Sequence, residues 1–235
     1  MKLKIMTYNV QHCYNQSLKD IDYNELALEI KNSNADIVGL NEIYGEGSIF
    51  GNQVEILAKK TEMNYYTFAA AFEHEYGPYG NGLLSKLPIR SVERIMIPDP
   101  VVKVNPEGYY ETRCILKVTF DDEITVLVSH FGLNDDEQKN AVSTVLSGIS
   151  NQRCILLGDF NFTPDNDLLS FFLNTMSDVS IGYCDDKKTW PSYSPCSKID
   201  YILVTKDIIV ETAKVSTNIV SDHLYHFAII CIQKN

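Results

Sequence analysis

Residues 154–158 constrain the fold most, because this apolar run passes directly into paired polar side chains. The run reads as a buried strand. Asp159 follows it and Asn161 lies two residues later, a spacing that places both side chains on one side of a strand. Pro164 then ends the strand. An Asp and an Asn at this position suit cation binding, proton transfer from water or positioning of a substrate oxygen, and an Asx turn is the simpler alternative.

The composition is that of an ordinary globular protein. The chain has 235 residues, of which 45% are hydrophobic and 22% charged, so it can bury a sizeable core without disulfides or a structural metal. Its net charge of −11 disfavours non-specific binding to long nucleic acids, which depends on Lys and Arg. None of the six cysteines forms a C-x-x-C pair, which argues against a zinc ribbon. We expect a single domain over residues 1–235.

No apolar run reaches the length of a transmembrane helix. Residues 1–10 read as a strand rather than a signal peptide. We therefore expect a cytoplasmic protein without stable membrane insertion, and the sequence makes no protein partner evident.

Hydrophobic periodicity predicts strands interrupted by two groups of helices. Strands are expected at 3–10, 36–43, 64–72, 81–85, 89–97, 109–120, 124–129, 154–158, 198–204, 208–216 and 225–232. Helices are expected at 22–33, 53–60, 135–150 and 165–173, and loops at 44–52, 73–80, 98–108 and 180–197. This order predicts an α/β or α+β chain with two sheets covered by helices.

Polar side chains recur where the predicted apolar strands end, and catalytic sites of α/β folds are assembled at strand ends. The set is Asn9, Glu42, Asn81, His130, Asp159, Asn161, Asp200, Asp222 and His223. Three of its carboxylates, Glu42, Asp159 and Asp222, suit Mg²⁺ or Mn²⁺ rather than Zn²⁺. A cation with histidine and carboxylate chemistry, and without an apparent covalent nucleophile, indicates hydrolysis of phosphate esters.

Seven short motifs in this chain resemble the endonuclease/exonuclease/phosphatase family of deoxyribonuclease-I-like proteins. They are Thr-Tyr-Asn-Val at 7–10, Leu-Asn-Glu at 40–42, Tyr-Gly-Asn-Gly-Leu-Leu-Ser at 79–85, Ser-His at 129–130, Gly-Asp-Phe-Asn at 158–161, Lys-Ile-Asp-Tyr-Ile at 198–202 and Ser-Asp-His at 221–223. Each is weak alone, but the ordered set is specific and spans nearly the whole chain. The resemblance implies a four-layer α/β sandwich, two packed mixed β-sheets flanked by helices, with one divalent-metal site at one end.

The resemblance also implies a role for each metal and water-binding residue. Glu42 would be the principal Mg²⁺ (or Mn²⁺) ligand, with Asn9 beside it. Asp222 would be a second metal contact or a partner of the histidines. Asp159 would orient or deprotonate the attacking water, and Asn161 would help to hold the phosphate.

The two histidines complete the implied set. His223 would stabilise the negative charge that develops on the phosphate, with Asp200 hydrogen-bonded to its other nitrogen. His130 resembles the second histidine of the deoxyribonuclease-like branch, as an acid or phosphate ligand. Asn81 would orient it and contact the phosphate. For Arg113 we expect a structural ion pair, with a phosphate contact as the alternative.

Departures from individual branches of the family bear on the substrate. Residues 129–132 differ from the Tyr-containing segment of the abasic-site endonucleases, and residues 195–200 from the Trp-Cys-Asp-Arg type motif of the inositol-phosphate 5-phosphatases. Residues 189–195, which include Trp190, look like a segment of many uncharacterised bacterial members; we expect them to border the substrate cleft or to pack as a loop.

We favour a phosphodiesterase or phosphatase that acts on a phosphorylated small molecule. An endo- or exonuclease acting on DNA or a short nucleic acid such as RNA is the alternative, and a catalytically silent binding module comes third.

Overall fold

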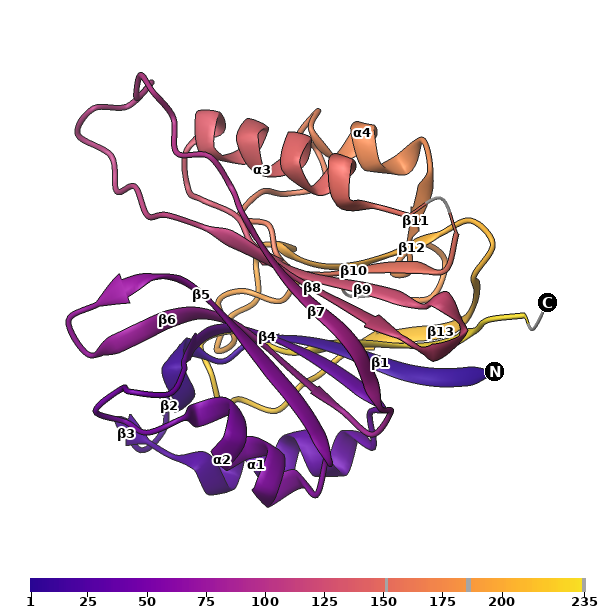
Figure 1. Cartoon of the computed structure of the whole chain (residues 1–235), viewed down its shortest axis with the longest axis horizontal. Coiled ribbons are helices and arrows are strands. Elements are labelled where there is room, and N and C mark those ends of the chain that lie inside the picture. Colours follow the sequence, from indigo (N-terminus) through magenta and orange to yellow (C-terminus); the bar gives the residue numbers. More distant parts are fainter. Residues whose placement is uncertain (151, 185–186, 234–235) are drawn as a thin grey trace.

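Two six-stranded sheets pack face to face in the computed structural model, which describes residues 1–150, 152–184 and 187–233 (Figure 1). The first sheet has the order β13 (Ile209–Val215), β14 (His226–Cys231), β1 (Lys2–Asn9), β4 (Ile37–Tyr44), β6 (Gly77–Ser85) and β5 (Tyr65–His74). The second has the order β11 (Met176–Asp178), β12 (Asp200–Thr205), β10 (Cys154–Asp159), β9 (Thr125–His130), β8 (Cys114–Phe120) and β7 (Ile89–Met96).

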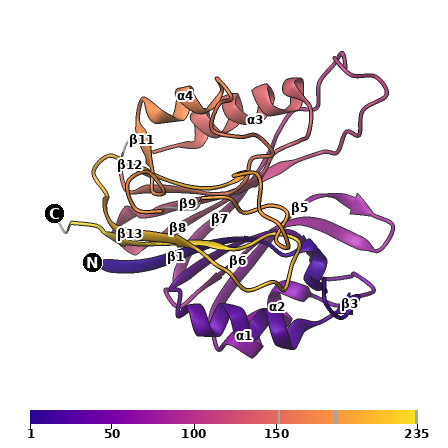
Figure 2. The ribbon, with the colours of Figure 1, turned by 180° about the vertical axis from the view of Figure 1, so that it is seen from behind.

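Helices cover the outer face of each sheet and complete the four layers (Figure 2). The first sheet carries α1 (Tyr23–Ser33) and α2 (Gln53–Thr61), and the second carries α3 (Asp135–Gly148) and α4 (Leu169–Leu173). Short elements fill the connections: the 3-10 turns η1 (Gln11–Cys13) and η2 (Asp121–Glu123), and the ribbon β2 (Tyr14–Asn15) with β3 (Asp20–Ile21). No helix among the described residues is long and apolar enough to cross a membrane.

Side-chain caps explain where the longer helices begin. The Asp22 carboxylate accepts hydrogen bonds from the backbone N–H groups of Asn24 and Glu25 at the start of α1. At α3, Asn134 and Glu137 form a reciprocal capping box. Because these caps are visible in the sequence as Asp or Asn before an apolar-periodic segment, the starts of α1 and α3 were predictable.

Each sheet is mixed, with one parallel pair at its centre. β1 pairs with β4, and β9 with β10, while all other neighbours among the described strands are antiparallel. The carboxyl ends of these four strands meet at the end of the sandwich that lies away from both termini (Figures 1 and 2). The polar residues that end the strands are therefore brought together.

The main apolar core lies between the sheets and sets the direction of the polar side chains. Ile155 and Leu157 of β10 belong to this core, and Asp159 is the next residue that faces the same way. In β12, Ile202 belongs to the same core and Asp200 precedes it by two. The inner faces thus change from apolar to polar at the end of the sandwich, and this change defines the site.

Most predicted elements are confirmed, and four segments differ. Residues 73–80, expected as a loop, extend β5 and begin β6 around a tight turn, and the rings of His74, Tyr76 and Tyr79 pack on one another there. The strand expected at 109–120 begins only at Cys114, and the helix expected at 165–173 is reduced to α4. The loop expected at 180–197 follows the unpredicted strand β11, and its residues 185–186 lie outside the described residues.

Candidate active site

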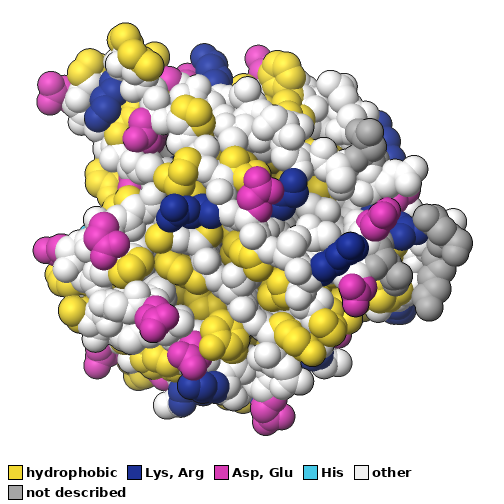
Figure 3. Space-filling model, viewed as in Figure 1, with side chains coloured by type: hydrophobic (Ala, Val, Ile, Leu, Met, Phe, Trp, Pro, Cys, Tyr) yellow, Lys and Arg dark blue, Asp and Glu magenta, His cyan; other side chains and the backbone are white. Residues whose placement is uncertain are grey.

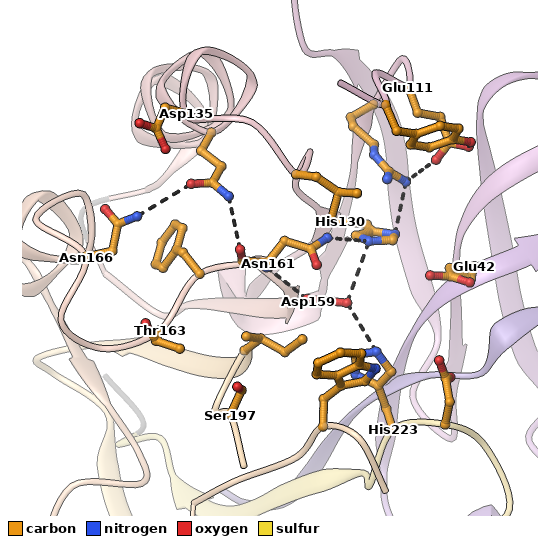
Figure 4. Close-up of a pocket in the computed structure, with 18 of the residues that line it drawn as sticks. Glu42, Glu111, His130, Asp135, Asp159, Asn161, Thr163, Asn166, Ser197 and His223 are labelled. Atoms are coloured by element: carbon orange, nitrogen blue, oxygen red, sulfur yellow. Dashed lines mark hydrogen bonds and ion pairs between the residues drawn. The ribbon is translucent and has the colours of Figure 1, made fainter. Parts of the chain in front are cut away.

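A cavity of about 820 Å³ opens where the central strands end (Figure 4). Six of the nine predicted site residues line it: Glu42, His130, Asp159, Asn161, Asp222 and His223. Asn9 and Asp200 lie behind this lining, where each hydrogen-bonds to a lining side chain. Asn81 is not among the lining residues. The strand-end pattern therefore predicted most of the wall that carries the acids and histidines.

Asp159 lies at the centre of these contacts. Its Oδ2 accepts a hydrogen bond from Nδ2 of Asn9 at 3.1 Å and lies 3.6 Å from Nε2 of both His130 and His223. Its Oδ1 accepts the backbone N–H of Asn161 at 2.9 Å. Burial raises the pKa of Asp159 to about 7, although the charge of His223 opposes this. The carboxylate is thus suited to exchange a proton near neutral pH.

His223 is held by a second carboxylate. Its Nδ1 lies 2.8 Å from Oδ2 of Asp200, and both residues are buried. Burial disfavours the imidazolium, but the charges of Asp200 and Asp159 outweigh it and raise the pKa of His223 to about 10. At neutral pH the ring is therefore a cation whose Nδ1–H donates to Asp200 and whose Nε2–H faces Asp159 and the cavity.

His130 has the opposite electrostatic character. Burial, together with the charges of Arg113 and His223, lowers its pKa well below the usual value, so the ring is neutral. Nη1 of Arg113 lies 3.1 Å from its Nδ1, and a guanidinium can only donate, so this contact favours the tautomer in which Nδ1 accepts and the ring proton lies on Nε2. The amide nitrogen of Asn161, which donates to the carbonyl of Phe131, lies 2.9 Å from Nε2 and also can only donate, so the neutral ring accepts from only one of these two neighbours at a time.

Glu42 reaches the site through a break in strand pairing. The register of β4 with β6 shifts between Leu40 and Ile43, and Glu42 has φ +56° within this bulge. Its Oε1 accepts from Nδ2 of Asn9 at 2.9 Å, and its Oε2 accepts from the Tyr79 hydroxyl at 3.2 Å. Burial raises the pKa of Glu42. A non-glycine residue in this conformation carries strain that the surroundings must hold, which is common at functional sites.

Asn41 is a supporting residue that the sequence analysis did not single out. Its amide donates to Oδ1 of Asn81 at 2.7 Å and to the carbonyl of Ser129 at 3.1 Å, and its Oδ1 accepts the backbone N–H of Asp159 at 3.0 Å. Asn81 donates onward to the carbonyl of Cys114. Asn81 therefore braces the two sheets through its bond to Cys114 and is itself held by Asn41, and none of its hydrogen bonds within the described residues is to His130.

The sequence analysis did not predict the polar residues that line the cavity on the side away from His223. Asp135 and Asn166 line it, and Figure 4 shows them on the far side of Asn161 from His223. Their signals in the sequence were weak, because Asp135 reads as a first-turn helix residue and Asn166 as a turn residue. Trp190 also lines the cavity, and the expectation that its segment borders the substrate cleft stays a prediction.

The donor set around Glu42 fits a hard divalent cation. Glu42, Asp159 and Asp222 line one cavity, and the hydrogen-bond donors to Glu42 within the described part of the chain, Asn9 and Tyr79, are neutral, so they leave the negative charge of Glu42 unbalanced. A second group, Asp159, Asp200 and His223, also has ligand atoms within 4.8 Å of one another. There the nitrogen of His223 that faces Asp200 is protonated, and a metal needs it neutral. The oxygen ligands at Glu42 are the better fit.

Comparison with known proteins agrees with this geometry. The model of the Endonuclease/Exonuclease/phosphatase family matches residues 6–223. The chain belongs to this family. The resemblance drawn from the seven motifs is thereby confirmed, and so is the four-layer fold that it implied. Family members include enzymes that hydrolyse phosphate esters and nucleic acids. A search of the curated proteins gives no match.

Solved structures of the endonuclease/exonuclease/phosphatase family share this fold. An endonuclease/exonuclease/phosphatase from Bacteroides vulgatus superposes with a TM-score of 0.78 at 18% identity, covering 99% of this chain and 100% of that one. The mannosyl-6-phosphatase Bt3783 of Bacteroides thetaiotaomicron gives 0.79 at 17% identity, covering 98% and 100%. Truncated TDP2 of Caenorhabditis elegans gives 0.65 at 15% identity, covering 98% and 97%. At these identities the likeness shows the fold.

Proposed function

We propose that this chain is a Mg²⁺- or Mn²⁺-dependent hydrolase of phosphate esters, a phosphatase or phosphodiesterase that acts on a small substrate. The observation that supports this most is the meeting of Asn9, His130 and His223 at one carboxylate oxygen of Asp159, beside Glu42. This arrangement provides a base, a fixed cation and a neutral donor around one point, and phosphoryl transfer to water needs these groups.

Asp159 is the proposed base. Its pKa of about 7 lets it take a proton from an attacking water and release it later at neutral pH. Asn9 and the backbone N–H of Asn161 fix the carboxylate from two sides. Water held against Oδ2 is thereby oriented before it attacks.

The two histidines and Asn161 are the proposed phosphate contacts. His223 offers an Nε2–H on a cationic ring that Asp200 holds in place. In the tautomer that Arg113 favours, His130 offers an Nε2–H on a neutral ring, and a substrate oxygen between this nitrogen and the amide of Asn161 would accept from both. Donors this close to one another suit a shared anionic oxygen, and a phosphoryl group presents three. His130 is in addition a candidate proton donor to the leaving alcohol. Asn81, which does not line the cavity, supports the site through its hydrogen bonds with Asn41 and Cys114.

Glu42 is the proposed principal metal ligand, with Asn9 and Asp222 beside it. A bound divalent cation supplies charge neutralisation and Lewis-acid stabilisation at the phosphoryl group. Tyr79 orients one oxygen of Glu42, and Asn9 orients the other. These two hydrogen bonds orient the carboxylate of Glu42 in the metal-free protein.

Charge favours a small substrate over a nucleic acid chain. Among the described residues, Arg113 is the only Lys or Arg that lines the cavity, and it is paired with Glu111. The face shown in Figure 3 carries its basic side chains between acidic ones, without a continuous basic stripe. A strand of nucleic acid needs Lys and Arg along its flanking phosphates. Nuclease activity is therefore the second candidate.

The test is hydrolysis of p-nitrophenyl phosphate and bis-p-nitrophenyl phosphate with Mg²⁺, Mn²⁺ or EDTA, for the wild type and Asp159→Ala. We expect turnover that requires the cation and falls at least 1,000-fold, roughly the worth of a general base with its oriented water, in the variant. Asp167→Ala, at an exposed aspartate outside the cavity, is the matched control and should keep full activity. Cation-independent turnover, or an active Asp159→Ala, would refute the proposal.

The ratio of diester to monoester turnover then separates a phosphodiesterase from a phosphatase. A single-stranded and a double-stranded oligonucleotide, assayed in parallel, test the nuclease alternative. Two further sequence expectations stay predictions: a single domain over residues 1–235 and a cytoplasmic location.

A further inference from the structure

The cavity has two chemically different halves, and the proposed reaction uses only one. Figure 4 shows Glu42, His130, Asp159 and His223 on one side of Asn161, and Asp135, Thr163 and Asn166 on the other. All seven line the same cavity of about 820 Å³. A phosphoryl group at the first half therefore leaves the second half for the alcohol to which it is esterified.

The polar groups of the second half are neutral or acidic, and the apolar Leu133 and Phe162 also line the cavity. Asp135 lies at the first position of α3, and its carboxylate makes no hydrogen bond or ion pair within the described part of the chain. The Thr163 hydroxyl and the Asn166 amide are half-buried beside it. Nδ2 of Asn166 makes only a 3.5 Å contact, to Oε1 of Gln138, while its Oδ1 accepts the backbone N–H of Leu168 at 2.9 Å. The Thr163 hydroxyl donates to Asp165 and keeps its acceptor capacity for a ligand hydroxyl. Such groups accept and donate to hydroxyls, and with no Lys or Arg among them they do not suit a second phosphate.

Two aromatic side chains also line the cavity. Trp190 lines the cavity at 39% exposure, and Tyr109 lines it at 63% exposure. Neither ring stacks against another ring among the described residues, whereas Tyr79 packs against Tyr44 and Phe72. An aromatic face next to carboxylate and amide groups suits an alcohol that has both hydroxyls and C–H surface.

We propose that the second half is an alcohol subsite for a neutral, polyhydroxylated leaving group, so that the substrate is a monophosphate ester of a sugar or polyol. This inference rests on the proposed function and adds the substrate class. Asp135, Thr163 and Asn166 bind the hydroxyls, and Trp190 covers a C–H face. Because Asp135 is acidic, a cationic alcohol is the alternative class of leaving group. The hydroxyl and amide groups favour the polyol, because they add nothing to the binding of a quaternary ammonium group.

The deciding experiment compares kcat/KM for esters that differ only in the alcohol. Glucose 6-phosphate and sorbitol 6-phosphate present hydroxyls, hexyl phosphate has similar length without them, and phosphocholine presents a cation. With p-nitrophenyl phosphate as the reference, we expect the two hydroxylated esters to exceed hexyl phosphate and phosphocholine at least tenfold. Equal or better turnover of hexyl phosphate or phosphocholine would overturn the proposal.

Asp135→Asn tests the alcohol subsite directly, since it keeps the shape and removes the charge. We expect the ratio of kcat/KM for sorbitol 6-phosphate to that for p-nitrophenyl phosphate to fall about tenfold, the typical worth of one hydrogen bond to a charged group. Asp167→Asn makes the same chemical change at an exposed carboxylate outside the cavity and should leave both substrates unchanged. An unchanged ratio in Asp135→Asn would refute a role for Asp135 in binding the alcohol.

A binding measurement separates failure of this inference from failure of the proposed function. Trp190 is the only tryptophan of the chain, so intrinsic fluorescence reports on the cavity. We expect sorbitol 6-phosphate, but not hexyl phosphate, to change the emission of the protein in EDTA. If p-nitrophenyl phosphate is hydrolysed and neither kinetics nor fluorescence distinguishes the polyol, only the alcohol subsite is refuted. If no ester is hydrolysed but the polyol ester alone changes the emission, the subsite stands and the hydrolase is refuted.

Discussion

The guanidinium of Arg113 donates to Nδ1 of His130 across 3.1 Å, and both groups are buried. The same Nη1 forms an ion pair with Glu111 at 2.6 Å, which confirms the structural ion pair expected for this arginine. The contact with His130 adds a second role. Because a guanidinium never accepts a hydrogen bond, it favours the neutral tautomer that carries its proton on Nε2, against the amide nitrogen of Asn161, which favours the other.

Replacing Arg113 should therefore change the pKa and the tautomer of His130 while the fold is retained. In Arg113→Met we expect the pKa of His130 to rise, because the charge of Arg113 contributes to holding it down, and we expect a mixture of ring tautomers. Nitrogen NMR of the imidazole measures both, and kcat should fall about tenfold with the loss of the oriented donor. Arg113→Lys restores the charge without the planar fork. A single unchanged tautomer in Arg113→Met would contradict the assignment.

Asp200 controls the charge of His223. Asp200→Asn should lower the pKa of His223 from about 10 toward its ordinary 6.5 and reduce kcat about 100-fold. Since the folded-state pKa lies above the ordinary value, the charged ring stabilises the fold fully below pH 6.5, and this stability is lost as the pH rises through about 10.

Thermal unfolding in EDTA between pH 6 and 10 tests the same pair. The wild type should lose stability over this interval, and Asp200→Asn should show a flatter dependence. Parallel curves for the two proteins would mean that Asp200 does not set the charge of His223.

Glu42 should lower the stability of the metal-free protein and bind the cation. Burial raises its pKa, so its charge at neutral pH costs folding energy in the metal-free protein. We expect Glu42→Gln to stabilise the protein in EDTA by about 1 kcal/mol and to remove the rise in Tm that Mg²⁺ gives the wild type. Glu46→Gln, at an exposed carboxylate four residues later, should change neither property. A Mg²⁺-dependent Tm that survives in Glu42→Gln would place the cation elsewhere.

The sequence predicted the residues that line the candidate site better than it predicted the residues and backbone features that hold them in place. The alternation of apolar residues in β10 fixes the direction of Asp159, so its place on the inner face followed from the pattern. The same rule places Glu42 on the face opposite Asn41, and only the bulge at φ +56° turns it into the cavity. Such a bulge depends on pairing with β6, a tertiary contact that local pattern does not encode.

Asn41 shows what a local pattern leaves out. It belongs to the Leu-Asn-Glu motif at 40–42, but its structural role depends on hydrogen bonds to Asn81, Ser129 and Asp159, which lie on three other strands. We expect Asn41→Ala to lower the free energy of unfolding by about 3 kcal/mol, because it removes the hydrogen-bond partner of the backbone N–H of Asp159 and of the amide oxygen of Asn81, both buried. Denaturant unfolding measures this, with exposed Asn64→Ala as the control. A loss below about 1 kcal/mol, the worth of one ordinary hydrogen bond, would mean that the site relaxes around the change.

Lys198 and Asp178 form a buried ion pair behind the site. Nζ of Lys198 lies 3.2 Å from Oδ2 of Asp178 and donates to the carbonyl oxygen of Asp200, also at 3.2 Å. Lys198→Met should destabilise the fold by about 3–5 kcal/mol, because it leaves the charge of Asp178 buried without its partner. Adding Asp178→Leu removes that charge as well, and we expect the double variant to regain most of the stability, as urea unfolding would show.

The double variant then separates support of the fold from support of the site. If Lys198 positions Asp200, the restored fold should still show a severalfold lower kcat at unchanged KM, because the carboxylate that orients His223 has lost one of its anchors. A double variant with wild-type kcat would instead mean that the ion pair stabilises the sandwich and has no part in placing His223.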